Sequence, residues 1–119
     1  MKEVILLGSD FLFNEELGSR LRGTGYNVYT FSNSQELINR LNSETIKVIL
    51  VILDLNIPDF NIEELAPMLK TRHIPIIAIG AHKDTASLKM AKALNVDLVI
   101  VNSQASNSIE TYVKSVLSN

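Results

Sequence analysis

Asp54 stands at the end of the longest apolar run in the chain, in the stretch "VILVILDLNIPD" that covers residues 48–59. A lone carboxylate in this place has two kinds of use. It can cap a turn or face water in a loop, or it can act as a nucleophile that accepts a phosphoryl group. Pro58 and Asp59 follow, which indicates that the chain turns soon after the run. The surrounding elements must decide between the two uses.

Length and composition are those of one domain, residues 1–119, with a hydrophobic fraction of 46% that is typical of a globular core. The chain contains no cysteine, which excludes thiol catalysis and cysteine-rich metal sites. Its net charge is −2 and it has no basic stripe, so we expect no direct binding to nucleic acid. Because it has no secretion signal and no run of the ~20 apolar residues that a membrane helix needs, we expect a cytoplasmic protein without membrane contact.

Five short apolar segments alternate with amphipathic segments along the chain. The expected strands are residues 4–7, 28–31, 48–53, 76–79 and 96–101. Three of these segments are nearly continuous aliphatic runs, which suits strands that are covered on both faces. Strict alternation of strand and helix therefore predicts an α/β fold, a doubly wound parallel sheet of five strands with helices on both faces.

The segments between the strands have the spacing of helices with one apolar face. In the first of them, Phe13, Leu17 and Leu21 recur every four residues. Polar residues that can cap the later helices stand near the expected starts: Ser34, Asn61 with Glu64, Asp84 and Ser106. Pro67 removes a hydrogen bond inside the third helical segment, so we expect a kink or a late start there.

In open parallel sheets, ligands bind beyond the carboxyl ends of the strands. The residues that follow the expected strands are therefore the candidate functional residues. They are Gly8, Ser9 and Asp10 after the first strand, Asp54 after the third, Gly80 and Ala81 after the fourth, and Asn102 and Ser103 after the fifth.

The order and lengths of these segments resemble the receiver domain of two-component response regulators, the CheY-like family, over essentially the whole chain. The clearest piece is "LVILDLNIPD", which resembles the family's third-strand motif with a phosphorylatable aspartate, here Asp54, and a proline four residues on. "IPIIAIGAH" resembles the fourth strand, and "ALNVDLVIVNS" resembles the segment through the fifth. The resemblance implies a flavodoxin-like (βα)5 sheet with strand order 2-1-3-4-5. It also implies a role in two-component signal transduction, as a response regulator or in a phosphorelay.

The residues that carry the family's chemistry differ at most positions. Where the resemblance implies an acidic pair that binds Mg²⁺, this chain has Gly8 and Ser9, although a one-residue slip would place Asp10 on the second acid. The other departures are Gly80 in place of a hydroxyl residue, Asn102 and Ser103 in place of Lys-Pro, and Val99 in place of an aromatic switch residue. The chain thus resembles a degenerate receiver, or pseudo-receiver.

Asp54 is the candidate phosphoacceptor, and Asp54 and Asp10 are weak candidates for binding Mg²⁺, which usually needs one or two protein carboxylates. Asp10 has a second interpretation as an acid at a helix N-terminus, where the helix dipole favours a carboxylate. A carboxylate attacks phosphorus only if the negative charge that gathers there is offset, and the residues that would offset it are missing. We therefore expect weak or no Mg²⁺ binding, and no other cofactor.

The leading interpretation is a receiver-fold signalling module that acts mainly by binding a protein, with little or no phosphorylation. It would be no enzyme, beyond self-phosphorylation on Asp54 at most. The partner would be a signalling protein, an output domain or a second copy of the chain. The resemblance places this contact on the fourth helix, fifth strand and fifth helix, where Lys89 and Lys92 face outward.

Two alternatives remain open. The first is a working receiver that is phosphorylated on Asp54. The second is a small-molecule-binding, flavodoxin-like domain that uses a pocket lined by Gly8, Ser9, Gly80 and Asn102.

Overall fold

The computed structural model describes residues 2–56 and 61–118, and within them five strands alternate with five helices. The strands are β1 (Lys2–Leu7), β2 (Asn27–Phe31), β3 (Lys47–Asp54), β4 (Ile76–Gly80) and β5 (Leu98–Val101). The helices are α1 (Phe11–Gly23), α2 (Ser34–Leu41), α3 (Ile62–Thr71), α4 (Thr85–Ala93) and α5 (Asn102–Leu117). The strands are parallel in the order β2-β1-β3-β4-β5, so the predicted sheet and its order are confirmed. In these ranges, no helix has the length and hydropathy of a membrane span.

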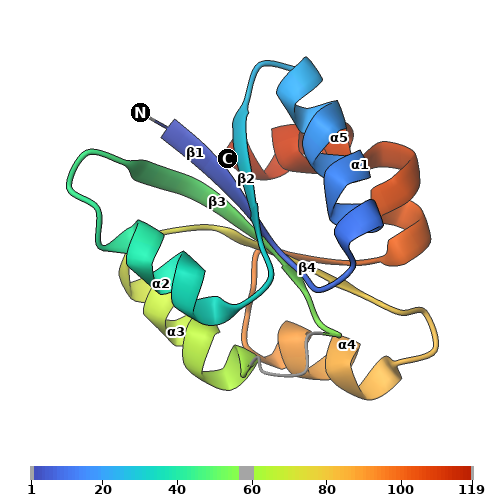
Figure 1. The fold of residues 1–119 in the computed structure, drawn as a ribbon. Coiled ribbons are helices and arrows are strands. Elements are labelled where there is room, and N and C mark those ends of the chain that lie inside the picture. The colour runs from blue at the N-terminus through green and yellow to red at the C-terminus, as the bar shows by residue number, and fades with distance from the viewer. Residues whose placement is uncertain (1, 57–60, 119) are drawn as a thin grey trace.

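Helices cover both faces of the sheet, with α1 and α5 on one face and α2, α3 and α4 on the other (Figure 1). Because side chains alternate along a strand, β3 contributes to the apolar core on each face. Leu50 and Ile52 pack beneath α1 and α5, whereas Val51 and Leu53 pack against the other helices. This double burial explains the unbroken aliphatic run of β3.

Two of the predicted helix caps are confirmed. The side chains of Asn61 and Asp84 accept hydrogen bonds from backbone N–H groups in the first turns of α3 and α4. The cap predicted at Ser34 is wrong, because Asn33 precedes α2 and its side chain accepts a hydrogen bond from the N–H of Glu36 at 3.0 Å. Asn and Ser are comparable caps, so two adjacent candidates could not be separated by residue type alone.

The starts of α3 and β5 also differ from the sequence-based expectation. The helix that contains Pro67 begins at Ile62, so the late start is wrong. The fifth strand begins at Leu98 and not at residue 96. The Asp97 side chain accepts a hydrogen bond from the backbone N–H of Ile76 at 2.8 Å, and so takes the place of a strand neighbour there.

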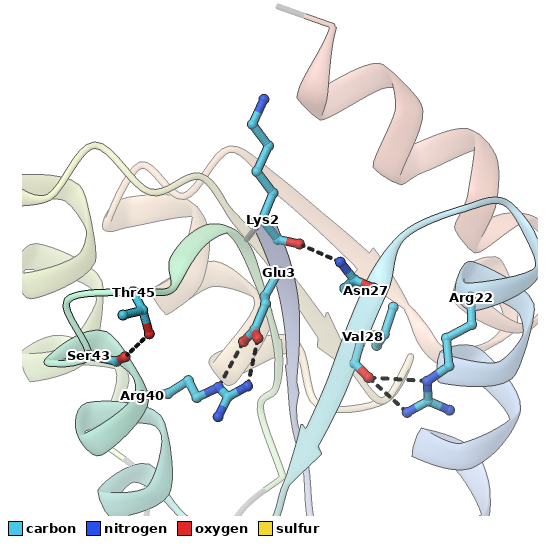
Figure 2. Close-up of polar contacts among 8 residues, drawn as sticks. All are labelled: Lys2, Glu3, Arg22, Asn27, Val28, Arg40, Ser43 and Thr45. Atoms are coloured by element: carbon cyan, nitrogen blue, oxygen red, sulfur yellow. Dashed lines mark hydrogen bonds and ion pairs between the residues drawn. The ribbon is translucent and has the colours of Figure 1, made fainter.

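A buried ion pair ties α2 to the amino end of β1. Glu3 is 0% exposed, and its carboxylate accepts two hydrogen bonds from the Arg40 guanidinium, at 2.8 and 2.6 Å (Figure 2). These hydrogen bonds raise the pKa of Arg40 above its ordinary value. The Arg40 Cζ atom also lies 4.2 Å from the centroid of the Tyr29 ring on β2. One side chain thus joins α2 to two strands.

Replacing Arg40 with alanine tests this contact, because the change leaves the Glu3 carboxylate buried without its partner. We expect Arg40→Ala to lower the free energy of unfolding by about 2–3 kcal/mol, somewhat less than a wholly buried pair would lose, since the guanidinium is partly exposed. Urea unfolding measures the loss. The double variant Glu3→Leu with Arg40→Leu removes both charges and should recover most of it. Equal losses in the single and double variants would contradict this account.

Candidate functional site

The carboxyl ends of the strands bring several predicted site residues to one edge of the sheet. In the strand register, Leu7 of β1 pairs with Leu53 of β3, and Asp54 pairs with Ile79 of β4. Gly8, Asp54 and Gly80 therefore follow one another across three neighbouring strands. The candidate site is at this edge, as expected for an open parallel sheet.

Asp54 is the last residue of β3 and is only 9% exposed. Its Oδ1 atom accepts a hydrogen bond from the backbone N–H of Asn56 at 2.9 Å. Burial raises the pKa of Asp54, the hydrogen bond from Asn56 opposes this, and the negative charge of Asp10 adds to it. The carboxyl group is held in place and is a weaker acid than an exposed aspartate. The turn predicted at Pro58 and Asp59 lies outside the described residues.

Asp10 is the N-cap of α1, and its exposed carboxylate accepts a hydrogen bond from the backbone N–H of Phe13 at 3.0 Å. This is the second of the two uses that the sequence offered for it. Within the described ranges, no three His, Cys, Asp or Glu side chains come together in a group that could hold a metal ion. Asp10 and Asp54 offer two carboxylates, and one oxygen of each already accepts a hydrogen bond from a backbone N–H group, of Phe13 and of Asn56.

The Asn14 side chain fills the space beside Gly8, where the resemblance implies an acid. Asn14 is 6% exposed, and its Nδ2 group donates a hydrogen bond to the Gly8 carbonyl at 2.8 Å. A Cβ atom added to Gly8 would lie 2.7 Å from Asn14 Oδ1. Any side chain at position 8 therefore requires Asn14 to move. Sequence reasoning missed Asn14. It could have been found as a polar residue on the helical face that also carries Leu17 and Leu21, because a polar side chain on a buried face needs a hydrogen-bond partner.

Leucine side chains fill the space beside Gly80, where the resemblance implies a hydroxyl group. A Cβ atom at Gly80 would lie 2.8 Å from Leu88 Cδ2 and 3.2 Å from Leu55 Cδ1. Leu88 comes from α4, and Leu55 directly follows the candidate phosphoacceptor. The position is thus apolar and closed. Beside the two glycines, the space that the small-molecule alternative would use holds the side chains of Asn14, Leu55 and Leu88.

The fifth helix starts directly after β5, so the cap predicted at Ser106 is wrong. Asn102 is its first residue and is exposed. The Gln104 side chain accepts a hydrogen bond from the backbone N–H of Val101 at 2.9 Å. The helix has a kink at Ser108, where φ is −146°. The kink is two residues beyond Ser106, so Ser106 lies inside the first part of the helix.

Several exposed apolar side chains were missed by the sequence analysis. Phe11 and Leu12 on α1 are 72% and 79% exposed, and Met90 on α4 is 43% exposed. Met90 stands between Lys89 and Lys92, the two predicted contact residues, which are both exposed. These side chains could have been predicted from the sequence as apolar residues that lie outside the apolar stripe of their helix.

A parallel sheet in the order β2-β1-β3-β4-β5, covered by helices on both faces, defines a CheY-like, flavodoxin-type fold. Residues 4–114 match the family model of the response regulator receiver domain. The chain therefore belongs to the response regulator receiver domain family, whose members work in two-component signalling. Receiver domains interact with other signalling proteins or with output domains.

Individual proteins agree with this assignment. The transcriptional regulatory protein CrdR of Helicobacter pylori is 34% identical over 93 residues, which are 76% of this chain and 43% of that protein. The chain thus spans less than half the length of this curated relative. A receiver protein from Burkholderia phymatum has a TM-score of 0.86 at 23% identity, over 99% of this chain and 96% of that one. CheY4 of Vibrio cholerae has a TM-score of 0.80 at 17% identity, over 98% and 99%. These two structures share the fold.

The raised pKa of Asp54 predicts a stability change that depends on pH. A carboxyl whose pKa is raised by folding stabilises the fold only below its unfolded pKa, and the contribution is lost as pH rises through the folded pKa. At neutral pH, which is above the unfolded pKa, burial of this acid therefore lowers the free energy of unfolding. We expect Asp54→Asn to raise the free energy of unfolding at neutral pH by more than the roughly 0.5 kcal/mol of an ordinary surface change.

Urea unfolding at several pH values checks this expectation. The advantage of Asp54→Asn should vanish as pH falls below about 3.9, the ordinary aspartate pKa. Glu44→Gln is the control, since Glu44 is an exposed carboxylate and no change in stability is expected. An advantage that is equal at all pH values would contradict the electrostatic explanation.

Magnesium binding is the second property that the site predicts. We expect Mg²⁺ to bind weakly or not at all near Asp54, because the position of an acidic ligand is Gly8 and its space is filled. Calorimetry with Gly8→Asp plus Asn14→Ala, which supplies both the acid and the room for it, should show tighter binding than Gly8→Asp alone. Low-micromolar binding to the wild-type chain would refute the expectation and favour the alignment that uses Asp10.

Proposed function

We propose that this receiver domain is a degenerate member of its family that acts chiefly by binding a protein partner, with little or no phosphorylation of Asp54. The observation that carries the proposal is that other side chains occupy the space beside two positions where the chain departs from the family pattern. Asn14 occupies it beside Gly8, and Leu88 occupies it beside Gly80. An acid at position 8 or a hydroxyl residue at position 80 would therefore require these side chains to move. Family membership supports a non-enzymatic signalling role, and we place the chain in the cytoplasm.

The electrostatics of the site support weak phosphoryl transfer. Within the described part of the chain, no Lys or Arg forms an ion pair with Asp54. The nearby charge that acts on it is the negative charge of Asp10, and both this charge and burial raise the pKa of Asp54. Phosphoryl transfer to a carboxylate needs positive charge to offset the phosphate oxygens. Asn102, in the position of the family's lysine, supplies none.

A readout of phosphorylation would also be weak. A phosphoryl group shifts a conformational equilibrium only through contacts that differ between the two states. Moving a population from mostly one state to mostly the other takes roughly 5.5 kcal/mol of such preference. Gly80 offers no hydroxyl, so the remaining contacts are backbone hydrogen bonds worth roughly 1.5–3 kcal/mol each when charged. The signal therefore rests on a surface that is present without phosphorylation.

The proposed contact surface consists of α4, β5 and α5. On α4, Lys89, Met90 and Lys92 are all exposed, so the helix offers one apolar side chain and two positive charges to a partner. Methionine is enriched at interfaces, and the lysines favour an acidic partner surface. The partner is a signalling protein, an output domain or a second copy of the chain. Similarity to a transcriptional regulatory protein supports an output domain among these.

A second candidate function is regulated phosphorylation, with Asp54 as the acceptor. The observation in its favour is that Asp54 ends β3 at the carboxyl edge and is held by the N–H of Asn56. Asp10 lies near enough to affect its pKa, as a second Mg²⁺ ligand would. Intact mass after incubation with acetyl phosphate and Mg²⁺ separates the two functions. We expect no phosphoryl adduct, and a near-complete adduct that Asp54→Asn abolishes would favour the second candidate.

Partner binding gives the complementary prediction. We expect Asp54→Asn to leave binding nearly intact, and Lys89→Glu with Lys92→Glu to weaken it by roughly tenfold or more, because like charges would then face an acidic partner. Quantitative affinity capture from the source cells measures both. Lys47→Glu is the matched control, since Lys47 is an exposed lysine at the amino end of β3. Loss of binding in Asp54→Asn, with binding kept in the double lysine variant, would overturn the proposal.

A further inference from the structure

The outer edge of β2 carries backbone groups that the sheet does not use. β2 is the first strand of the sheet order, so it has a strand neighbour on one side only (Figure 1). The carbonyl of Phe31 accepts a hydrogen bond from the N–H of Gly8, and therefore faces β1. Because successive residues of a strand turn their backbone groups to opposite sides, those of Val28 and Thr30 face outward. An edge of this kind is a template for one more strand.

Arg22 of α1 covers one of these outward groups. Its Nε and Nη2 atoms donate hydrogen bonds to the Val28 carbonyl at 3.1 and 2.9 Å (Figure 2). The guanidinium thus stands where the N–H group of a neighbouring strand would be. Arg20 and Arg40 are paired with glutamates, whereas Arg22 forms no ion pair with any residue of the described ranges. Its charge is therefore available to a carboxylate from outside the chain.

A groove with a volume of about 540 Å³ lies along this edge. Its lining residues come from the end of α1, the following turn and β2: Arg22, Gly25, Tyr26, Asn27, Val28 and Tyr29. The sequence from Leu17 to Gln35 contains two arginines and no acidic residue, so no local side chain neutralises Arg22. The Tyr29 side chain is 40% exposed and adds apolar area. The groove therefore favours an extended segment with negative charge.

We propose that the β2 edge binds an extended, acidic protein segment by strand addition. The backbone of the segment pairs with the outward groups of Val28 and Thr30. Arg22 releases the Val28 carbonyl to an N–H group of the segment and takes a Glu or Asp carboxylate of the segment in a two-point hydrogen-bonded pair. β2 and β5 are opposite edges of the sheet, so this surface is separate from the contact surface proposed on α4, β5 and α5.

A labelled peptide tests the proposal on the whole chain. The probe is a fluorescein-labelled, amidated peptide of sequence Ser-Val-Glu-Val-Thr-Val-Ser, and its control has Gln in place of Glu. Fluorescence anisotropy should show saturable binding of the Glu peptide, and about tenfold weaker binding of the Gln peptide. Arg22→Ala should weaken the Glu peptide by a similar factor and remove the preference for Glu, because the two changes delete the same contact.

A second variant tests the backbone pairing. Thr30→Pro removes an outward N–H group and leaves the inward hydrogen bonds of β2, so it should weaken both peptides alike. Lys89→Glu with Lys92→Glu should change neither, which keeps this test independent of the proposed function. Absence of saturable binding up to about 1 mM, a weak affinity by any standard, would overturn the proposal. Equal or tighter binding by Arg22→Ala would also overturn it, and would show that Arg22 only shields the edge. If Arg22→Ala does not fold, equal binding of the two peptides by the wild type still refutes it.

Discussion

Burial of β3 on both faces is the constraint on which the rest of the structure depends. Since Leu50 and Ile52 need one helical layer and Val51 and Leu53 need another, helices must cover both sides of the sheet. Polar chemistry is then excluded from the middle of the strand and confined to its ends. Asp54 takes the first position where a carboxylate is tolerated, and even there burial raises its pKa. Burial of β3 thus explains both the position of Asp54 at the end of the strand and the rise of its pKa.

The two glycines of the site are packed, and this changes how the departures from the family pattern are understood. A lost side chain normally leaves a cavity, which destabilises a fold in proportion to the volume left empty. Beside Gly8 the space holds an amide that also satisfies a backbone carbonyl, and beside Gly80 it holds aliphatic carbon. The space beside these two glycines is therefore occupied without the groups that would serve phosphorylation.

Periodicity and residue type were sufficient for the elements, because these depend on local sequence. The aliphatic run of β3 and the caps at Asn61 and Asp84 are signals of this kind. The strand order came from the family resemblance. Errors arose where a neighbour in sequence competed, as Asn33 did with Ser34, or where a helix began before its predicted cap, as α5 does at Asn102.

Contacts between distant elements were beyond the reach of one sequence. Glu3 and Arg40 are apart in the chain, and no spacing rule connects them, although they form a buried ion pair. The same is true of Gly80 and Leu88, which come from a strand and a helix. In the candidate site, the acid could be located from the sequence, but the filling of the space around it could not. Residue identity predicts which groups are missing, and only packing reveals what replaced them.

The contact between Asn14 and Gly8 also couples these two positions. An acid at position 8 requires the Asn14 side chain to move, because its Cβ atom would lie 2.7 Å from the amide oxygen. Movement or loss of that amide leaves the buried Gly8 carbonyl without its hydrogen-bond donor, which is unfavourable. The effects of substitutions at positions 8 and 14 on the free energy of unfolding should therefore not be additive.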